Sequence, residues 1–350
     1  MATKSASGPS TRESLGTIIR ENLPVIVVGL FSLILLIVVF LEGGIAQILN
    51  VLVTGGMWGL LATGLALVFG VMNIPHFAHG ESFMVGGYVA YFTFTPMNEY
   101  LIKNPNPFLS AIMPFGAILA AGLVGAVLGA IIERLVFAPL RHRTKERWIM
   151  NAFLLTVGLS FILVNGVNLA LGPNFRGIPR YWKIGAVEVL GSFIAVDRII
   201  AFFIALVTIA ILWFFLRQTK TGRAIRAVSQ DETGAQLMGI NLDFIQTLTF
   251  SLATAMAAIS GASLLFMFQA YPTVGGTPLY FSWYVVMMVG LGNVAGAIVG
   301  GFIVALLQTA TQMFVGLSWQ TVLPTGFMIL ILLMAPSGIF GTEVKGAQEQ

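Results

Sequence analysis

Nine segments of this chain are apolar over about the length that crosses a lipid bilayer. A membrane-spanning helix needs about 20 apolar residues. Hydrophobic residues make up 57% of the 350 residues and charged residues 9%, whereas soluble chains are about 25% charged. Lipid must therefore surround most of the chain, so we predict an all-α polytopic membrane protein with about eight to ten transmembrane helices, including broken or re-entrant segments. The candidate spans are residues 24–41, 45–72, 77–95, 108–132, 148–171, 199–216, 244–269, 283–314 and 319–335.

The two ends of the chain are more polar than its middle. We predict a polar cytoplasmic tail over residues 1–22, one transmembrane domain over residues 23–341 and a short C-terminal tail over residues 342–350. No small-residue cleavage pattern follows the first apolar run, which indicates a retained span rather than a signal peptide.

Two basic loops, residues 133–148 and 217–241, are separated by two predicted spans and so share one side of the membrane. The positive-inside rule makes this side, with the N-terminus, cytoplasmic. The loop on the opposite side, residues 172–198, is also basic. It is longer and contains Glu188 and Asp197, so it ranks below the other two loops as a sign of the cytoplasmic side. The net charge of +4 is modest and scattered, which argues against a nucleic-acid partner and fits contact with membrane lipid.

Between two apolar runs lies the polar stretch NIPHFAHGE, residues 73–81. Pro75 lacks a backbone donor and Gly80 loosens the chain, so we predict a break between two helices at residues 73–80. Because a carboxylate at membrane depth is costly, Glu81 should face the bundle interior, a water-filled cavity or the interface. Asn73, His76, His79 and Glu81 are thus candidate translocation-pathway residues. The alternative is a tight packing turn.

A second interruption, GLGNVAG at residues 290–296, divides the long apolar segment 283–314. We predict a broken helix over residues 290–301, with Asn293 as a further pathway candidate. The pairs Gly86-Gly87 and Gly300-Gly301 each follow such an interruption and precede an aromatic residue. Transporters are often built from two repeats that handle substrate at broken helices.

Several kinds of chemistry lack their sequence signatures. His76, His79 and Glu81 match no strong zinc pattern, and there is no cysteine, so we expect no metal and no cofactor. A nucleophile elbow is absent, which leaves an intramembrane enzyme unsupported. A proton-coupled secondary transporter would use the same three residues as a relay. Because the chain has no P-loop, any ATP hydrolysis belongs to separate subunits.

The basic loop at residues 217–241 has the pattern of an amphipathic cytoplasmic helix. Arg223 and Arg226 lie on one helix face, and Gly239 follows as a stop signal. Such a helix is a natural docking site for a partner protein. The alternative is a solvated loop that anchors lipid head groups.

The motifs GLALVFGVMNIPHFAHGESFMVGGYVAY, GRAIRAVSQDETGAQLMGIN, VGLGNVAGAIVGG and MAPSGIFG occur in this order between residues 45 and 341. In this order they resemble the permease subunits of branched-chain amino acid ABC transporters. Against the family pattern, His76 is an extra histidine, Gly87 replaces an alanine, and Asn293 stands where serine or threonine is common.

The resemblance implies an inner-membrane importer subunit that is not itself an enzyme. The implied partners are a second homologous permease subunit, two ABC ATPase subunits and an extracytoplasmic substrate-binding protein. It also implies ATPase contact over residues 222–241, where Ala235 and Gly239 fit the coupling pattern and Thr233 replaces its glutamate. The ATPase-coupling candidates are Gly222, Arg223, Arg226, Thr233, Ala235 and Gly239.

The resemblance implies transport of branched-chain or similar apolar amino acids, with urea or short-chain amides as the alternative substrates. A zwitterion needs partners for its carboxylate and its ammonium, and broken helices present suitable dipole ends. Glu81 would meet the ammonium directly or hold His79 through a charge-assisted hydrogen bond. We favour the second role, because a strong fixed site would slow release.

Overall fold

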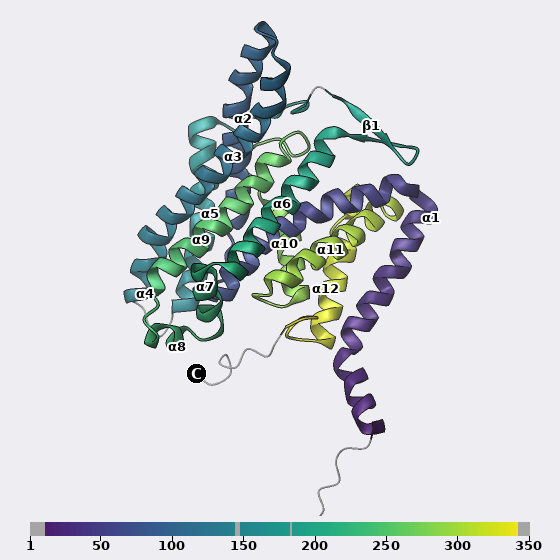
Figure 1. Ribbon diagram of the computed structural model, residues 1–350, viewed down its shortest axis with the longest axis vertical. Coiled ribbons are helices and arrows are strands. Elements are labelled where there is room, and N and C mark those ends of the chain that lie inside the picture. The colour runs from purple at the N-terminus through teal and green to yellow at the C-terminus, as the bar shows by residue number, and fades with distance from the viewer. Residues whose placement is uncertain (1–10, 144–147, 183, 342–350) are drawn as a thin grey trace, which may run out of the picture.

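The computed structural model of the chain describes residues 11–143, 148–182 and 184–341. It is a helical bundle with one small hairpin (Figure 1). In chain order the elements are α1 (Thr11–Met72), α2 (His79–Lys103), α3 (Pro107–Ile132), the π-helix η1 (Glu133–Phe137), α4 (Ala138–Arg143), α5 (Trp148–Leu171), β1 (Ala186–Val189), β2 (Ser192–Ala195), α6 (Val196–Gln218), α7 (Lys220–Gln230), α8 (Glu232–Leu237), α9 (Leu242–Ser263), α10 (Gly276–Val289), α11 (Val294–Phe314), the 3-10 helix η2 (Leu317–Trp319) and α12 (Val322–Met334).

Seven of the described helices are long and apolar enough to cross a membrane. The first of them, in α1, contains a kink at Gly44, where φ is 64° and ψ is −165°. Glycine adopts this backbone conformation at little cost because it lacks a Cβ atom. Dividing α1 at the kink raises the number of spans from seven to eight, and the predicted all-α polytopic fold is confirmed.

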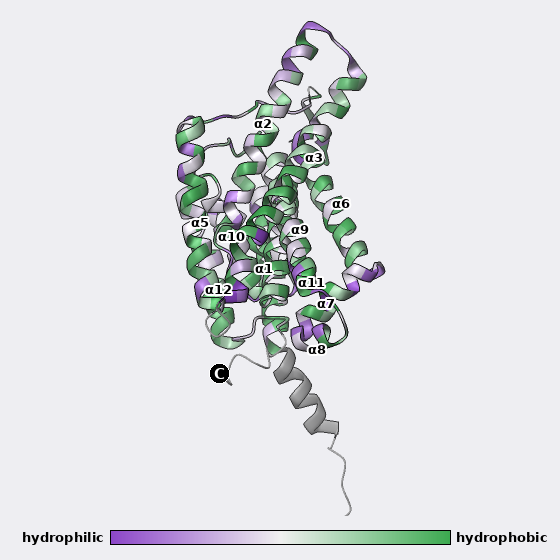
Figure 2. Cartoon of the chain, turned by 90° about the vertical axis from the view of Figure 1, so that its left-hand side faces the viewer, coloured by the Kyte–Doolittle hydropathy of each residue, from purple (hydrophilic) through white to green (hydrophobic). Residues whose placement is uncertain are grey.

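The part of α1 that follows the kink is the central helix of the bundle. It packs against α6, α9, α10 and α11, and Met57, Leu60 and Leu61 on it are fully buried. The part that precedes the kink has an exposed apolar surface that includes Ile34 and Leu41. Figure 2 shows mostly hydrophobic colour along α6 and hydrophilic colour near α7 and α8. This distribution fits a bundle surrounded by lipid.

Glycines bring several of the helices into backbone contact. A Cβ atom at Gly86 of α2 would collide with the backbone of Ala258 on α9, and one at Gly301 of α11 would lie 2.5 Å from the backbone nitrogen of Gly59 on α1. Small residues at such crossings are typical of membrane helices, because they allow close packing. Both glycines follow a helix break, as their sequence contexts indicated.

The described parts of the two basic loops lie at the same end of the bundle, where α4, α7 and α8 are found (Figure 1). A salt bridge of 2.8 Å joins Arg141 Nη2 in the first loop to Asp243 Oδ1, which lies in the first turn of α9 directly after the second loop. The hairpin of β1 and β2 lies at the other end, so the shared side of these loops is confirmed.

Helix α1 already begins at Thr11, inside the predicted tail. Residues 1–10, 144–147 and 342–350 lie outside the described residues.

Candidate functional site

The first helix break lies where the sequence predicts it. Helix α1 ends at Met72 and α2 begins at His79. Asn73 has a positive φ of 53°, and its N–H donates to the carbonyl of Phe69 at 3.0 Å. Asparagine is one of the few residues other than glycine that visit this conformation readily. The hydroxyl of Thr156 on α5 donates to the carbonyl of Pro75 at 3.0 Å and holds the connecting segment in place.

Glu81 and His79 face the bundle interior but bond to different partners. The hydroxyl of Ser160 donates to Glu81 Oε1 at 2.6 Å, and His79 Nε2 lies 3.0 Å from the carbonyl of Leu61. The interior position of Glu81, with 7% of its surface exposed, was predicted. The expected hydrogen bond from Glu81 to His79 was wrong, because each side chain reaches a neighbouring helix instead.

His76 completes this buried group. Its ring centroid lies 5.7 Å from that of His79 and 4.8 Å from that of Phe250. Among the described residues, both ring nitrogens of His76, Nδ1 of His79 and Oε2 of Glu81 have no hydrogen-bond partner. Buried polar atoms are normally paired with protein or ordered water, so these four atoms need water or a ligand.

The second helix break separates α10 from α11 at residues 290–293, with positive φ values at Gly290 and Gly292. Asn293 Oδ1 accepts from the N–H of Gly296 at 2.8 Å and caps α11, while its Nδ2 donates to the carbonyl of Phe340 at 3.1 Å. The predicted break is therefore present, but it is shorter than predicted, because α11 starts at Val294.

The two breaks adjoin one another. A Cβ atom at Gly292 would lie 2.8 Å from Cα of Gly70, which precedes Asn73 by less than one helical turn. The C-terminal segment covers the second break, since the N–H groups of Ile339 and Phe340 donate to the carbonyls at the end of α10. Asn73 and Asn293 are thus brought into one region, whereas His76, His79 and Glu81 lie in the bundle interior.

A cavity lies elsewhere, at the hairpin end of the bundle. Its volume is about 810 Å³ and its wall combines apolar and amide side chains. None of the five pathway candidates lines it. Its polar residues were not predicted from the sequence. Their only signals there are isolated amides within apolar spans and a basic residue at the start of an apolar span. These polar residues are Gln47, Asn50, Thr54, Arg198, Gln308, Thr309, Gln312 and Gln320.

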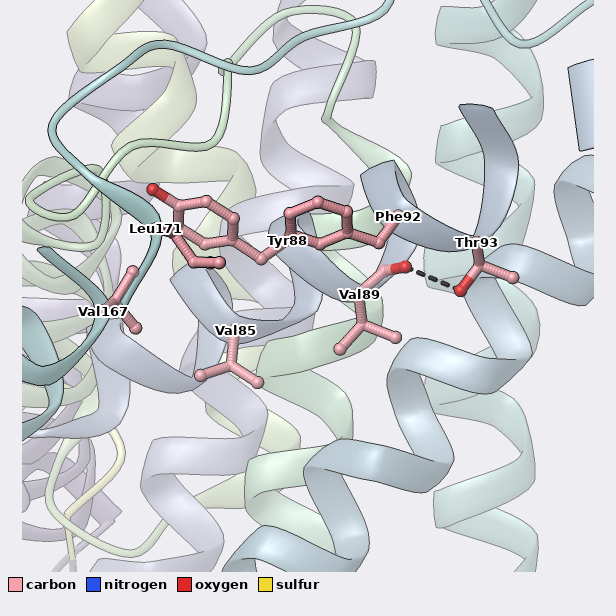
Figure 3. A pocket seen from close by; sticks show the side chains of 7 residues that line it. All are labelled: Val85, Tyr88, Val89, Phe92, Thr93, Val167 and Leu171. Carbon is pink, nitrogen blue, oxygen red and sulfur yellow. Dashed lines mark hydrogen bonds between the residues drawn. The ribbon is translucent and has the colours of Figure 1, made fainter. Parts of the chain in front are cut away.

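A smaller pocket of about 460 Å³ lies between α2 and the end of α5. Figure 3 shows its lining, which is aliphatic and aromatic apart from two hydroxyl groups. The hydroxyl of Thr93 donates to the carbonyl of Val89 at 2.7 Å, and that of Tyr88 has no partner among the described residues. This lining offers no charged partner to a zwitterion.

The amphipathic helix predicted at residues 217–241 is present as two shorter helices, because Asp231 Oδ1 accepts from the N–H of Gly234 at 2.9 Å and caps a new helix. Gly222 and Ala235 are buried against the bundle. Arg223, Arg226, Thr233 and Gly239 are exposed. Gly239 has a φ of 82° and ends α8, as predicted.

An apolar pair next to these residues was not predicted from the sequence. Leu237 and Met238 are 83% and 84% exposed, although they lie in a polar loop. Their signal was present in the sequence as two adjacent apolar residues between polar ones. Contiguous exposed apolar surface can mark a site that contacts a protein or a membrane.

An all-α bundle with a lipid-facing exterior, two internal helix breaks and amphipathic helices at one end has the architecture of a multi-pass membrane transport protein. Residues 47–332 match the family described as branched-chain amino acid transport system, permease component. The chain belongs to this family.

Curated relatives agree with this membership. The high-affinity branched-chain amino acid transport system permease protein LivH of Escherichia coli (strain K12) is 28% identical over 310 residues, covering 84% of this chain and 94% of the relative. The corresponding protein BraD of Pseudomonas aeruginosa is 28% identical over 300 residues, covering 84% and 95%. The inner membrane ABC transporter permease protein YjfF of Escherichia coli (strain K12) is 25% identical over 347 residues, covering 92% and 94%. No solved structure matches the chain.

Proposed function

We propose that this chain is the membrane-spanning permease subunit of an ATP-driven ABC importer for branched-chain or similar apolar amino acids. The observation that carries the proposal is the family match over residues 47–332, together with relatives named for branched-chain amino acid transport. The name of YjfF supports the ABC class. In this proposal a binding protein delivers the amino acid, and this chain pairs with a second homologous permease.

The ATPase subunits dock on α7 and α8 in this proposal. Three features support the assignment: the exposed arginines Arg223 and Arg226, the exposed pair Leu237 and Met238, and the buried contacts that tie both helices to the bundle. A force applied to α8 reaches α9 directly, since Gln246 Nε2 on α9 donates to Glu232 Oε1 on α8 at 3.2 Å. This end of the bundle and the N-terminus are then cytoplasmic, in agreement with the positive-inside rule.

The translocation route borders the first helix break in this proposal. The support is the set of unpaired polar atoms on His76, His79 and Glu81, which a hydrated route would satisfy. Asn73 and Asn293 lie where the two breaks adjoin, toward the end that carries α7 and α8. A substrate that enters at the hairpin end would pass the buried group before reaching them.

Uptake by intact cells tests the proposal. Deleting this chain from the cell that encodes it should abolish high-affinity uptake of labelled leucine, isoleucine and valine, and a plasmid copy should restore it. Depleting ATP should stop the uptake while a proton uncoupler that leaves ATP intact should not. Loss of urea or amide uptake with intact leucine uptake would favour the alternative substrates. Uptake that follows the proton gradient would favour a secondary transporter.

A further inference from the structure

The cavity at the hairpin end contains one charged side chain, Arg198, at the start of α6. Its wall is built by residues from α1, β2, α6, α11 and the segment after α9. The volume of about 810 Å³ lies within the range of small-molecule sites, roughly 300–1,000 Å³. The site therefore has room for an amino acid, and its single charge is positive.

Arg198 has no counter-ion among the described residues. Its Nη1 donates to Asn50 Oδ1 at 3.2 Å, which is a neutral partner. The adjacent Asp197 is buried and is not among the residues that line the cavity. Its Oδ1 accepts from the backbone N–H groups of Tyr181 at 2.6 Å and Trp182 at 3.2 Å. A guanidinium group presents several donors in a planar fork that matches a carboxylate. Arg198 is thus a free cation with donors available to an anion.

The cavity wall also holds neutral amides in fixed orientations. The indole of Trp58 donates to Gln308 Oε1 at 2.7 Å, and Gln308 and Gln312 each donate to Gln320 Oε1 at 2.9 Å. Gln312 Oε1 has no bond among the described residues and can accept from an ammonium group. Apolar surface is supplied by side chains such as Trp58 and Phe268.

We propose that Arg198 and Asn50 form a subsite for the α-carboxylate of a neutral amino acid in this cavity. The proposal rests on the proposed function and adds the location and chemistry of recognition. The ammonium meets only neutral amide oxygens and the side chain meets apolar surface, so the site selects the carboxylate without a fixed anion that would slow release. Urea and simple amides lack a carboxylate and would gain nothing from Arg198.

Site-directed labelling of the assembled complex tests the subsite. The chain has no cysteine, so Thr54→Cys introduces a single thiol into the cavity wall. Leucine should slow its reaction with a maleimide in the absence of the binding protein. Leucinamide has the same side chain and ammonium but no carboxylate. The concentration of leucinamide needed for the same protection should be at least about tenfold higher. This comparison needs no change at Arg198.

Substitutions then assign the effect to one residue. In the Thr54→Cys background, Arg198→Gln should raise the leucine concentration needed for protection about tenfold, and Arg198→Lys should raise it less. Arg180→Gln, which removes an exposed charge from the same loop, should leave it unchanged. Equal protection by leucine and leucinamide, absence of protection, or protection unaltered by Arg198→Gln would overturn the subsite. Failure of ATP-driven leucine uptake in the unmodified complex would instead overturn the proposed function.

Discussion

The hydroxyl of Ser160, on α5, donates a 2.6 Å hydrogen bond to Oε1 of Glu81, on α2. This contact joins the polar helix break to a helix that otherwise packs loosely at the edge of the bundle, with Ala152 and Thr156 as its only fully buried residues. Oε2 of the same carboxyl group has no partner among the described residues. One oxygen is therefore fixed by the fold, and the other is free to contact water or substrate.

We predict that Glu81→Gln reduces leucine uptake several-fold without disturbing assembly. The substitution keeps the shape of the side chain, and the amide oxygen can still accept from Ser160, but the negative charge is lost. His79→Ala should also reduce uptake, and both variants should elute with the whole complex in size-exclusion chromatography. If both transport at the rate of the unmodified protein, the break has a packing role and the route does not depend on it.

The helix α7 provides a test of coupling. Ala227→Pro should abolish ATP-dependent uptake, since proline in a helix interior costs about 3 kcal/mol and Ala227 lies well inside Lys220–Gln230. The membrane bundle should stay folded, because α7 lies outside the spans. Ala227→Ser keeps the backbone N–H and serves as the control. Uptake and ATPase stimulation that persist in a stable Ala227→Pro protein would show that α7 does not dock the ATPase.

Two helical glycines give a matched test of packing. Gly86→Ala should lower the unfolding temperature in detergent, because the added methyl group would collide with the backbone of Ala258 and overpacking costs about 1–3 kcal/mol. Gly158→Ala, on α5, meets nothing within 4 Å and should leave the temperature unchanged or raise it slightly through helix propensity. Equal effects of the two substitutions would contradict the close contact of α2 with α9.

Leu291 and Val299 are both 49% exposed, but the structure places them in different surroundings. Leu291→Cys at the second break should react with an impermeant maleimide from the same side of the membrane as Leu237→Cys on α8. Val299→Cys, on α11, should stay unlabelled because lipid covers it. Phe193→Cys in the hairpin should react from the opposite side. If Leu291→Cys reacts with the maleimide from neither side of the membrane, the break lies inside the membrane.

The sequence predicted the helices and their breaks more fully than the polar contacts between them. Pro75 restricts the local backbone and lacks a donor, and the glycines near Asn293 permit positive φ values, so both interruptions were visible from neighbouring residues. The partner of Glu81 is 79 positions away, and no local pattern specifies it. This distance explains why the expected bond to His79 was wrong.

Arg198 shows the same limit. In the sequence it was one of several basic residues in the loop at residues 172–198, which also contains Asp197. In the structure Asp197 bonds the backbone of Tyr181 and Trp182, and Arg198 lines a cavity formed by segments more than 100 residues apart. Only the packing of these segments shows that Asp197 and Arg198 bond to different partners.

The most direct test of the account is transport by the purified complex in proteoliposomes. The permease, its partner subunits and the binding protein are reconstituted, and accumulation of labelled leucine is measured with ATP or a non-hydrolysable analogue. The account predicts accumulation only with ATP and the binding protein together, and no accumulation of urea. Leucine entry that is as fast with the analogue as with ATP would contradict it. ATP-driven accumulation of urea but not of leucine would also contradict it.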